Sequence, residues 1–352
     1  MQHITPLINV RNSNLELLRI VSMFLVLLIH YIPSRMTVSP ETIRTNFFAS
    51  LGQLELNSIC FVCVNCFIII SGYFGIRWKA KSFSKFLYTI LFWAIIAYAL
   101  SLFIGNYIES PKDLYAGNFI QVAYVSRWFI GAYLCLYIVA PLVNSFIEKC
   151  SVRDLGRFII VFYLFSTIYG WFLLSKNFNE GMSELSLIGL YLVGAYLKRS
   201  KLIIFSFKPT TDIIIYFGLG LVLVGINSII YYIGINKSVY GYLNPIIILE
   251  SIYLFLFFKK IKIGYKPWIN TIAASAFSAY LLHHHQYIFP YYEMLSKWVN
   301  NNVSLSLLCM IGIIISIMLF CTTIDFLGNK LFNLFYNTAA PKKNIISVNP
   351  QE

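Results

Sequence analysis

The sequence predicts an all-α integral membrane protein with about ten transmembrane helices and both termini in the cytoplasm. Its 352 residues are 59% hydrophobic and only 12% charged, whereas soluble domains are nearer one-quarter charged. Apolar stretches of about 17–25 residues recur along the chain, each long enough to cross a hydrocarbon core of about 30 Å. These two observations exclude a soluble protein, and the distribution of basic residues orients the chain.

Ten apolar segments are expected to span the membrane. They are residues 15–33, 56–75, 84–105, 126–146, 157–175, 185–198, 210–233, 242–258, 271–290 and 304–327. The first segment contains Arg19 and lacks a small-residue cleavage site after it, so it is expected to be a span and not a cleaved signal peptide. The chain is expected to form one membrane domain, 1–330, followed by a short polar cytoplasmic tail, 331–352.

With both termini inside, twenty of the 27 Lys and Arg residues fall on the inner side, as the positive-inside rule requires. The seven on the outer side are Arg35, Arg44, Lys112, Arg127, Lys176, Lys237 and Lys297. The formal net charge of +13 therefore reports topology, and no nucleic-acid partner is expected. The inner clusters would also attract a phosphate-rich cytosolic ligand.

Arg19 and His30 are the most informative pair in the chain. A spacing of eleven returns a side chain to nearly the same helix face, about 16.5 Å further along the axis. Ionisable groups in a span are costly, and their presence favours a functional role. The alternative is two interfacial anchors, with Arg19 snorkelling to one headgroup region and His30 capping the helix at the other.

Three further polar positions lie at span ends. Ser71 occupies an apolar helix next to Gly72, where a small-residue packing face is the simpler interpretation. Arg77 lies just beyond the end of this span, 56–75, and belongs to an inner basic cluster. Trp128 follows Arg127 at a span entrance, a pairing that is typical of an interfacial anchor.

Glu250 is the only acid expected deep in the bilayer, where it must be neutral or paired. Either a structural ion pair or an acid–base role would satisfy that constraint. His283, His284 and His285 are consecutive, and neighbours on a helix point about 100° apart. Only His283 is therefore expected to face the bundle interior, and a metal-chelating triad is disfavoured.

Known catalytic motifs are largely missing. The sequence contains no Gly-rich phosphate loop, no His-Glu-x-x-His and no Gly-x-Ser-x-Gly. Cys60, Cys63 and Cys66 share a helical spacing without nearby His or acidic partners, so reduced buried thiols are expected and no metal. Histidines, a buried acid and cytosolic cations suit proton transfer on a hydroxyl or thioester.

The chain resembles the membrane acyltransferase family 3. The opening from Arg11 through Arg19 to His30 is similar to the start of that family, in which an Arg, ten residues and a His recur in the first span. Glu16 and Ile20 depart from the commoner Asp and Gly. Further similar blocks follow in order at 67–73, 128–131, 136–142, 189–198 and 278–283.

The resemblance implies a stand-alone O-acyltransferase of the bacterial inner membrane. Such a protein transfers an acyl group, usually acetyl, from cytosolic acetyl-CoA to a hydroxyl of a cell-surface or lipid-linked glycan. Arg19 would hold the CoA phosphates, with Arg77, Ser71 and Trp128 as further donor-binding residues. His30 would act as the general base or carry the acyl group transiently. Glu250 and His283 would orient it or transfer protons.

Two other functions remain open from the sequence. A transporter or flippase of a glycan or lipid-linked intermediate would use the same polar groups along a path, although no internal repeat supports it. A regulatory membrane protein without chemistry is disfavoured by the buried charges. Membrane lipid is expected around the protein, and the sequence leaves open whether it forms a homo-oligomer.

Overall fold

A computed structural model describes residues 13–31, 38–104, 128–173 and 175–339. The expected outer loop 106–125 and the last part of the expected tail, 340–352, lie outside these residues. All regular structure in the described part is helical. The main helices are α1 (Ser13–Tyr31), α2 (Pro40–Thr45), α3 (Phe47–Phe61), α4 (Cys63–Phe74), α5 (Ala80–Ile104), α7 (Trp128–Lys149), α8 (Val152–Ser166), α9 (Glu184–Arg199), α10 (Pro209–Tyr232), α11 (Pro245–Lys260), α12 (Pro267–Ala274), α13 (Ala276–His283), α14 (Phe289–Asn302) and α15 (Ser306–Ala339).

Six described helical segments are long and apolar enough to cross a membrane. They are Ser13–Tyr31, Phe47–Phe74, Ala80–Phe103, Trp128–Lys149, Pro209–Tyr232 and Ser306–Tyr336. The other four expected spans are helical but shorter or interrupted. For example, α8 continues into a π-helical turn at Thr167–Phe172, and the ninth expected span is broken between α12 and α13. The all-helical membrane fold is confirmed, whereas ten spans and the inside location of both termini stay predictions.

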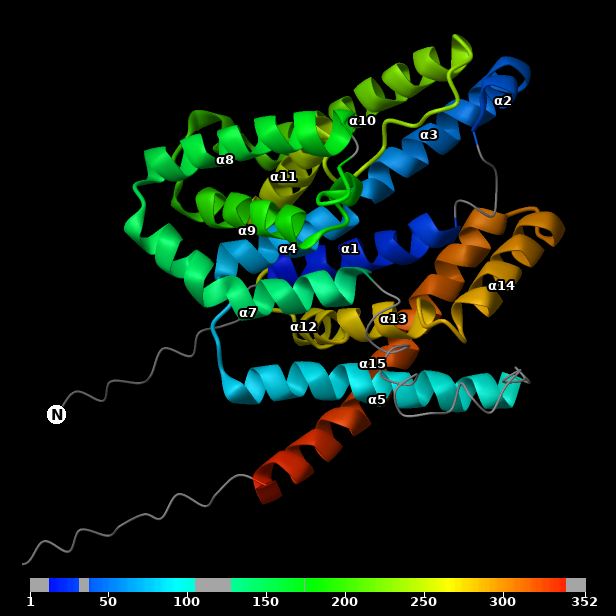
Figure 1. The fold of residues 1–352 in the computed structure, drawn as a ribbon. Helices are drawn as coiled ribbons and strands as arrows, with labels where there is room; N and C mark the ends of the chain where they lie inside the picture. Colours follow the sequence, from blue (N-terminus) through cyan, green and yellow to red (C-terminus); the bar gives the residue numbers. More distant parts are fainter. Residues whose placement is uncertain (1–12, 32–37, 105–127, 174, 340–352) are drawn as a thin grey trace, which may run out of the picture.

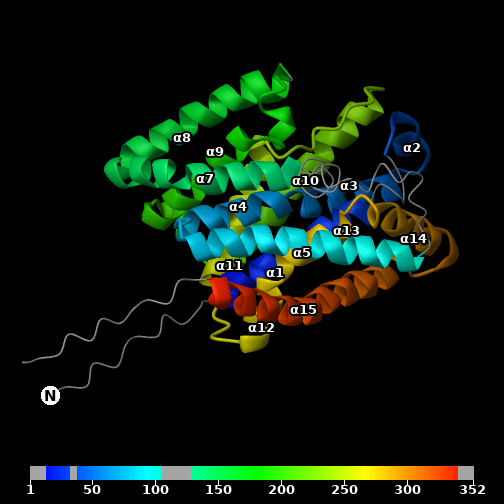
Figure 2. The same ribbon diagram turned by 60° about the horizontal axis from the view of Figure 1, so that its bottom comes forward.

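Helix α1 lies in the middle of the bundle (Figures 1 and 2) and packs against α4, α11, α12 and α13. Within the apolar stretch of α1, 61% of the residues are buried, against 22% for that of α15. Polar contacts fix the start of α1. The Ser13 hydroxyl accepts the Lys266 backbone N–H at 2.8 Å, and the Asn14 side chain bonds the backbone at Ile261 and Ile263. The polar residues at the start of α1 are thus held inside the protein.

Two glycines allow α4 and α9 to pack backbone against backbone. A Cβ on Gly72 would overlap the Tyr191 carbonyl, and one on Gly194 would overlap the Ile69 carbonyl. Small residues permit this close helix approach inside a membrane. The expected packing face around Ser71 and Gly72 is therefore present, and its partner is α9.

Helix α15 is longer than the sequence indicated. It continues to Ala339, so the expected domain boundary at residue 330 falls within the helix. The expected tail therefore begins with helix, at least through Ala339.

Gly72→Ala is expected to lower the free energy of unfolding by about 2 kcal/mol or more, because overpacking a well-filled interface costs roughly 1–3 kcal/mol. Gly225→Ala in α10 is the matched control, since a Cβ there has no neighbour within 4 Å. Thermal unfolding of both variants in the same detergent tests this. Equal melting temperatures would contradict the close packing of α4 on α9.

Candidate active site

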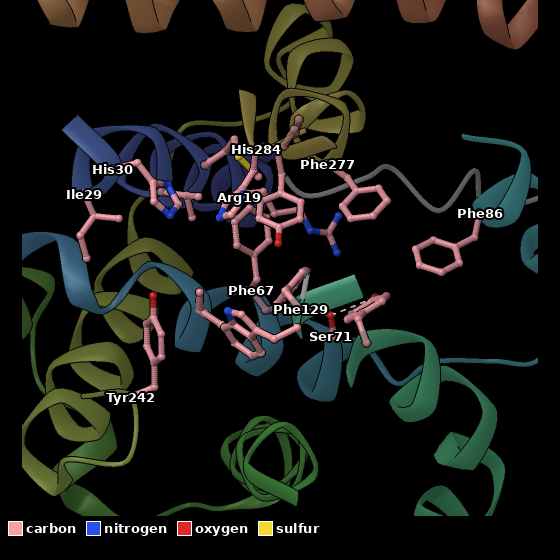
Figure 3. A pocket seen from close by; sticks show the side chains of 18 of the residues that line it. Arg19, Ile29, His30, Phe67, Ser71, Phe86, Phe129, Tyr242, Phe277 and His284 are labelled. Atoms are coloured by element: carbon pink, nitrogen blue, oxygen red, sulfur yellow. Dashed lines mark hydrogen bonds between the residues drawn. The ribbon is translucent and has the colours of Figure 1, made fainter. Parts of the chain in front are cut away.

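A cavity of about 280 Å³ opens between α1, α4, α7 and the α12–α13 pair. Arg19 and His30 both line it, and so do Ser71 and Trp128. Figure 3 shows Arg19 and His30 on the same side of the cavity, with Phe67 and Ser71 facing them from α4. The eleven-residue spacing thus places both ionisable side chains of α1 on one surface, as the sequence predicts.

His30 is hydrogen-bonded to His283. His283 Nε2 lies 3.1 Å from His30 Nδ1, and His283 Nδ1 lies 2.8 Å from the Ala279 carbonyl oxygen. A carbonyl can only accept, so His283 donates from Nδ1, and a neutral His283 accepts at Nε2. His30 then donates from Nδ1, and its unprotonated nitrogen is Nε2. This chain of contacts orients His30 as a base.

His284 also belongs to the site, contrary to the prediction that only His283 faces inward. Its ring centre lies 4.7 Å from that of His30, and it lines the cavity. His285 is buried as well. The prediction failed because α13 ends at His283, so the 100° rule for neighbours on a helix does not apply beyond that residue.

Asp325, near the end of the last expected span, is a buried acid that the sequence interpretation missed. Its carboxylate oxygens accept the Trp93 Nε1–H at 2.8 Å and the Ser278 hydroxyl at 2.6 Å. Asp325 thereby ties α15 to α5 and to α13, the helix that ends with His283. Its position within an apolar segment of the last helix was the available signal.

Arg19 is oriented by the preceding turn of its own helix. Its Nη1 bonds the buried Glu16 carboxylate at 2.8 Å. The guanidinium carbon lies 5.8 Å from the centre of the Phe74 ring, at the end of α4. Because a guanidinium has five N–H donors, the contact with Glu16 leaves donors that can meet a ligand in the cavity.

The cavity has two chemically different ends, because α1 and α4 run antiparallel along it. Phe74 of α4 is level with Arg19. Asn65, nine residues earlier and thus about 13.5 Å away, donates to the Tyr242 carbonyl at 3.2 Å. The side chain of Tyr242 extends from there toward Ile29 and His30 (Figure 3).

Ser71 and Trp128 lie at different ends of this cavity. Ser71 is three residues before Phe74 on α4. Its hydroxyl bonds the Phe67 carbonyl of the same helix and lies 3.5 Å from the Tyr133 hydroxyl. The ring of Trp128 lies 5.9 Å from that of Tyr242. Ser71 is thus near the Arg19 end, and Trp128 is near the His30 end.

Three of the expected site residues do not line the cavity, namely Arg77, Glu250 and His283, the last of which reaches it only through its hydrogen bond to His30. Arg77 is exposed, just beyond the end of α4. Glu250 is buried between α3, α10 and α11, where it accepts the Ser58 hydroxyl at 3.0 Å. No basic side chain of the described residues pairs with it, so the structural ion pair considered for Glu250 is absent there.

The family of the chain follows from comparison with known proteins. A family model of the acyltransferase 3 type, described as an acyltransferase domain, matches residues 12–324, nearly the whole chain. The chain belongs to this acyltransferase family. No curated protein and no solved structure matches it.

Membership and fold together give the general function. The protein is a multi-pass membrane acyltransferase, and the resemblance seen in the sequence is confirmed. All seven cysteines are free thiols. Among the described residues, no group of His, Cys, Asp and Glu has the arrangement of a metal site. Arg19, His30 and His284 are ionisable side chains that line the cavity.

Asp325→Ala is expected to lower both the stability of the protein and its acyltransferase activity. The Trp93 N–H and the Ser278 hydroxyl would lose their acceptor, and each buried unsatisfied group costs about 1–3 kcal/mol. Thr323→Val is the control, because the Thr323 hydroxyl is exposed and bonds only its own helix at Leu319. Thermal unfolding and acyl transfer are measured for both. A variant as stable and active as the control would refute the role of Asp325.

Proposed function

We propose that the protein is an O-acetyltransferase of a bacterial cytoplasmic membrane. It transfers an acetyl group from cytosolic acetyl-CoA to a hydroxyl of a cell-surface or lipid-linked glycan. The observation that supports this most directly is that one cavity is lined by a cation, Arg19, and by a histidine, His30, that is hydrogen-bonded to His283. That arrangement matches a donor that is anionic at one end and carries a reactive thioester at the other.

The Arg19 end receives the donor. Arg19 binds the CoA phosphates, since guanidinium donors suit phosphate oxygens. Arg77 lies outside the cavity beyond Phe74, among exposed basic residues that attract the same anion before it enters. Ser71 lies on the way inward, and the pantetheine arm covers the roughly 16.5 Å that separates the levels of Arg19 and His30.

The transfer takes place at His30. Nε2 of His30 removes the proton of the acceptor hydroxyl while the oxygen of that hydroxyl attacks the thioester carbonyl carbon. The C–S bond then breaks and an O-acetyl ester remains. The proton passes from His30 Nε2 to the departing thiolate, which leaves as the free CoA thiol. His283 accepts from Nδ1 throughout and stabilises the transient imidazolium. His30 need not become acetylated in this sequence.

His30→Gln is expected to reduce acetyl transfer at least about a hundredfold, because general base catalysis contributes about 10²–10⁴-fold. The test is the O-acetyl content of the surface polysaccharide in strains that express wild-type or variant protein at equal levels. Normal O-acetylation with His30→Gln would exclude the catalytic role of His30.

Arg19→Ala is expected to raise the KM for acetyl-CoA about ten- to hundredfold, since a hydrogen bond to a charged group contributes about 1.5–3 kcal/mol. Arg157→Ala is the matched control. Arg157 also pairs with an acid three residues away, Asp154, but lies on the exposed surface of α8. Steady-state kinetics of the purified proteins in detergent tests this. An unchanged KM for Arg19→Ala would place the donor elsewhere.

If the purified wild-type protein binds no acetyl-CoA but moves glycan across the membrane of liposomes, the flippase is favoured over the acetyltransferase. Isothermal titration with acetyl-CoA is therefore the first measurement on the purified chain.

A further inference from the structure

The aromatic wall at the His30 end of the cavity has a role that acetyl transfer does not yet explain. Trp128 and Tyr242 both line the cavity, and their ring planes meet at 39°. Trp128 contacts Tyr242, whose side chain extends toward Ile29 and His30 (Figure 3), so both rings lie away from the CoA phosphates proposed at Arg19. Because they lie beside His30, at the end of the cavity opposite Arg19, they are candidates to contact the acceptor.

Tyr242 is held from two sides. The Asn65 side chain bonds its backbone carbonyl, and the neighbouring Leu243 N–H points to the Glu180 carbonyl at 3.4 Å. A Cβ on Gly181 would collide with Tyr242. The turn next to Tyr242 and helix α4 thus fix its location.

That turn is strained. Asn179, Glu180 and Gly181 are three successive residues with φ of 42°, 55° and 104°. Left-handed conformations cost energy for residues other than glycine and persist where the surroundings enforce them. Strain next to a cavity wall fits a side chain that must be held in one place.

Figure 3 shows the Tyr242 side chain rising from the segment before α11 toward the side of the cavity with Ile29 and His30. Behind Tyr242 the ring of Phe61 lies 5.6 Å away. Two aromatic side chains, Trp128 and Tyr242, therefore line the cavity on the side where the hydroxyl nucleophile must approach His30.

We propose that Trp128 and Tyr242 form a platform on which a pyranose ring of the acceptor stacks. This assignment rests on the acetyl transfer proposed above. A pyranose has a face of C–H groups and a rim of hydroxyls. Its C–H face suits the electron-rich face of an aromatic ring. Seated there, the rim directs one hydroxyl to Nε2 of His30. Trp128 thereby binds the acceptor and not the donor.

The test compares Leu and Phe substitutions at both positions, since Phe keeps a ring and Leu does not. The substrates are acetyl-CoA and oligosaccharide from the organism's own surface polysaccharide after chemical removal of its acetyl esters. Trp128→Leu and Tyr242→Leu are expected to raise the KM for the oligosaccharide about tenfold and to leave the KM for acetyl-CoA unchanged. Trp128→Phe and Tyr242→Phe are expected to stay within about threefold of wild type. The matched control is Trp298→Leu in α14, an exposed residue that does not line the cavity.

Binding of the same oligosaccharide, followed by calorimetry, separates this proposal from the catalytic one. If the wild type transfers acetyl and both Leu variants keep the wild-type KM for the oligosaccharide, the platform is refuted and the proposed transferase activity stands. The platform would also be overturned if the Leu substitutions raised the KM for acetyl-CoA instead. Wild type that binds the oligosaccharide without transferring acetyl, with binding lost in the Leu variants, would support the platform and refute the proposed transferase. Should one Leu variant fail to fold, the other Leu and Phe pair gives the same comparison.

Discussion

Polar side chains inside an apolar bundle must find partners within the protein, and this constraint determines the arrangement of the site. His30 is paired with His283, and His283 with the Ala279 carbonyl one turn earlier. Helix α13 is itself fixed by Asp325, which bonds Ser278 and Trp93. Contacts made to satisfy buried groups thereby hold an imidazole in one orientation, which a base requires.

The antiparallel course of α1 and α4 gives the cavity its direction. Arg19 and Phe74 mark one end, and His30 with the side chain of Tyr242 marks the other. A donor with charge at one end and a thioester at the other would therefore enter in a single orientation. Under the proposed function, acceptor and donor would approach the same imidazole from opposite ends, and the transfer would be completed inside the bundle.

The sequence predicted the helical membrane fold, the family and the shared face of Arg19 and His30, because hydropathy and helical periodicity are local properties. It did not predict the contribution of His284, since the end of α13 at His283 follows from tertiary packing. Asp325 was overlooked although it lies in an expected span, and its partners come from helices distant in sequence. Glu250 was correctly expected to be buried, but the helices that surround it, and hence its distance from the cavity, could not be inferred from its own segment.

The central claim is that one bound donor extends from Arg19 to His30. Its most direct test is an electron cryo-microscopy structure of the protein with a non-transferable thioether analogue of acetyl-CoA. The account predicts the diphosphate beside the Arg19 guanidinium and the acyl carbon within about 3.5 Å of His30 Nε2, the separation expected for reacting atoms. An analogue bound outside the cavity, or with its acyl end away from His30, would contradict it.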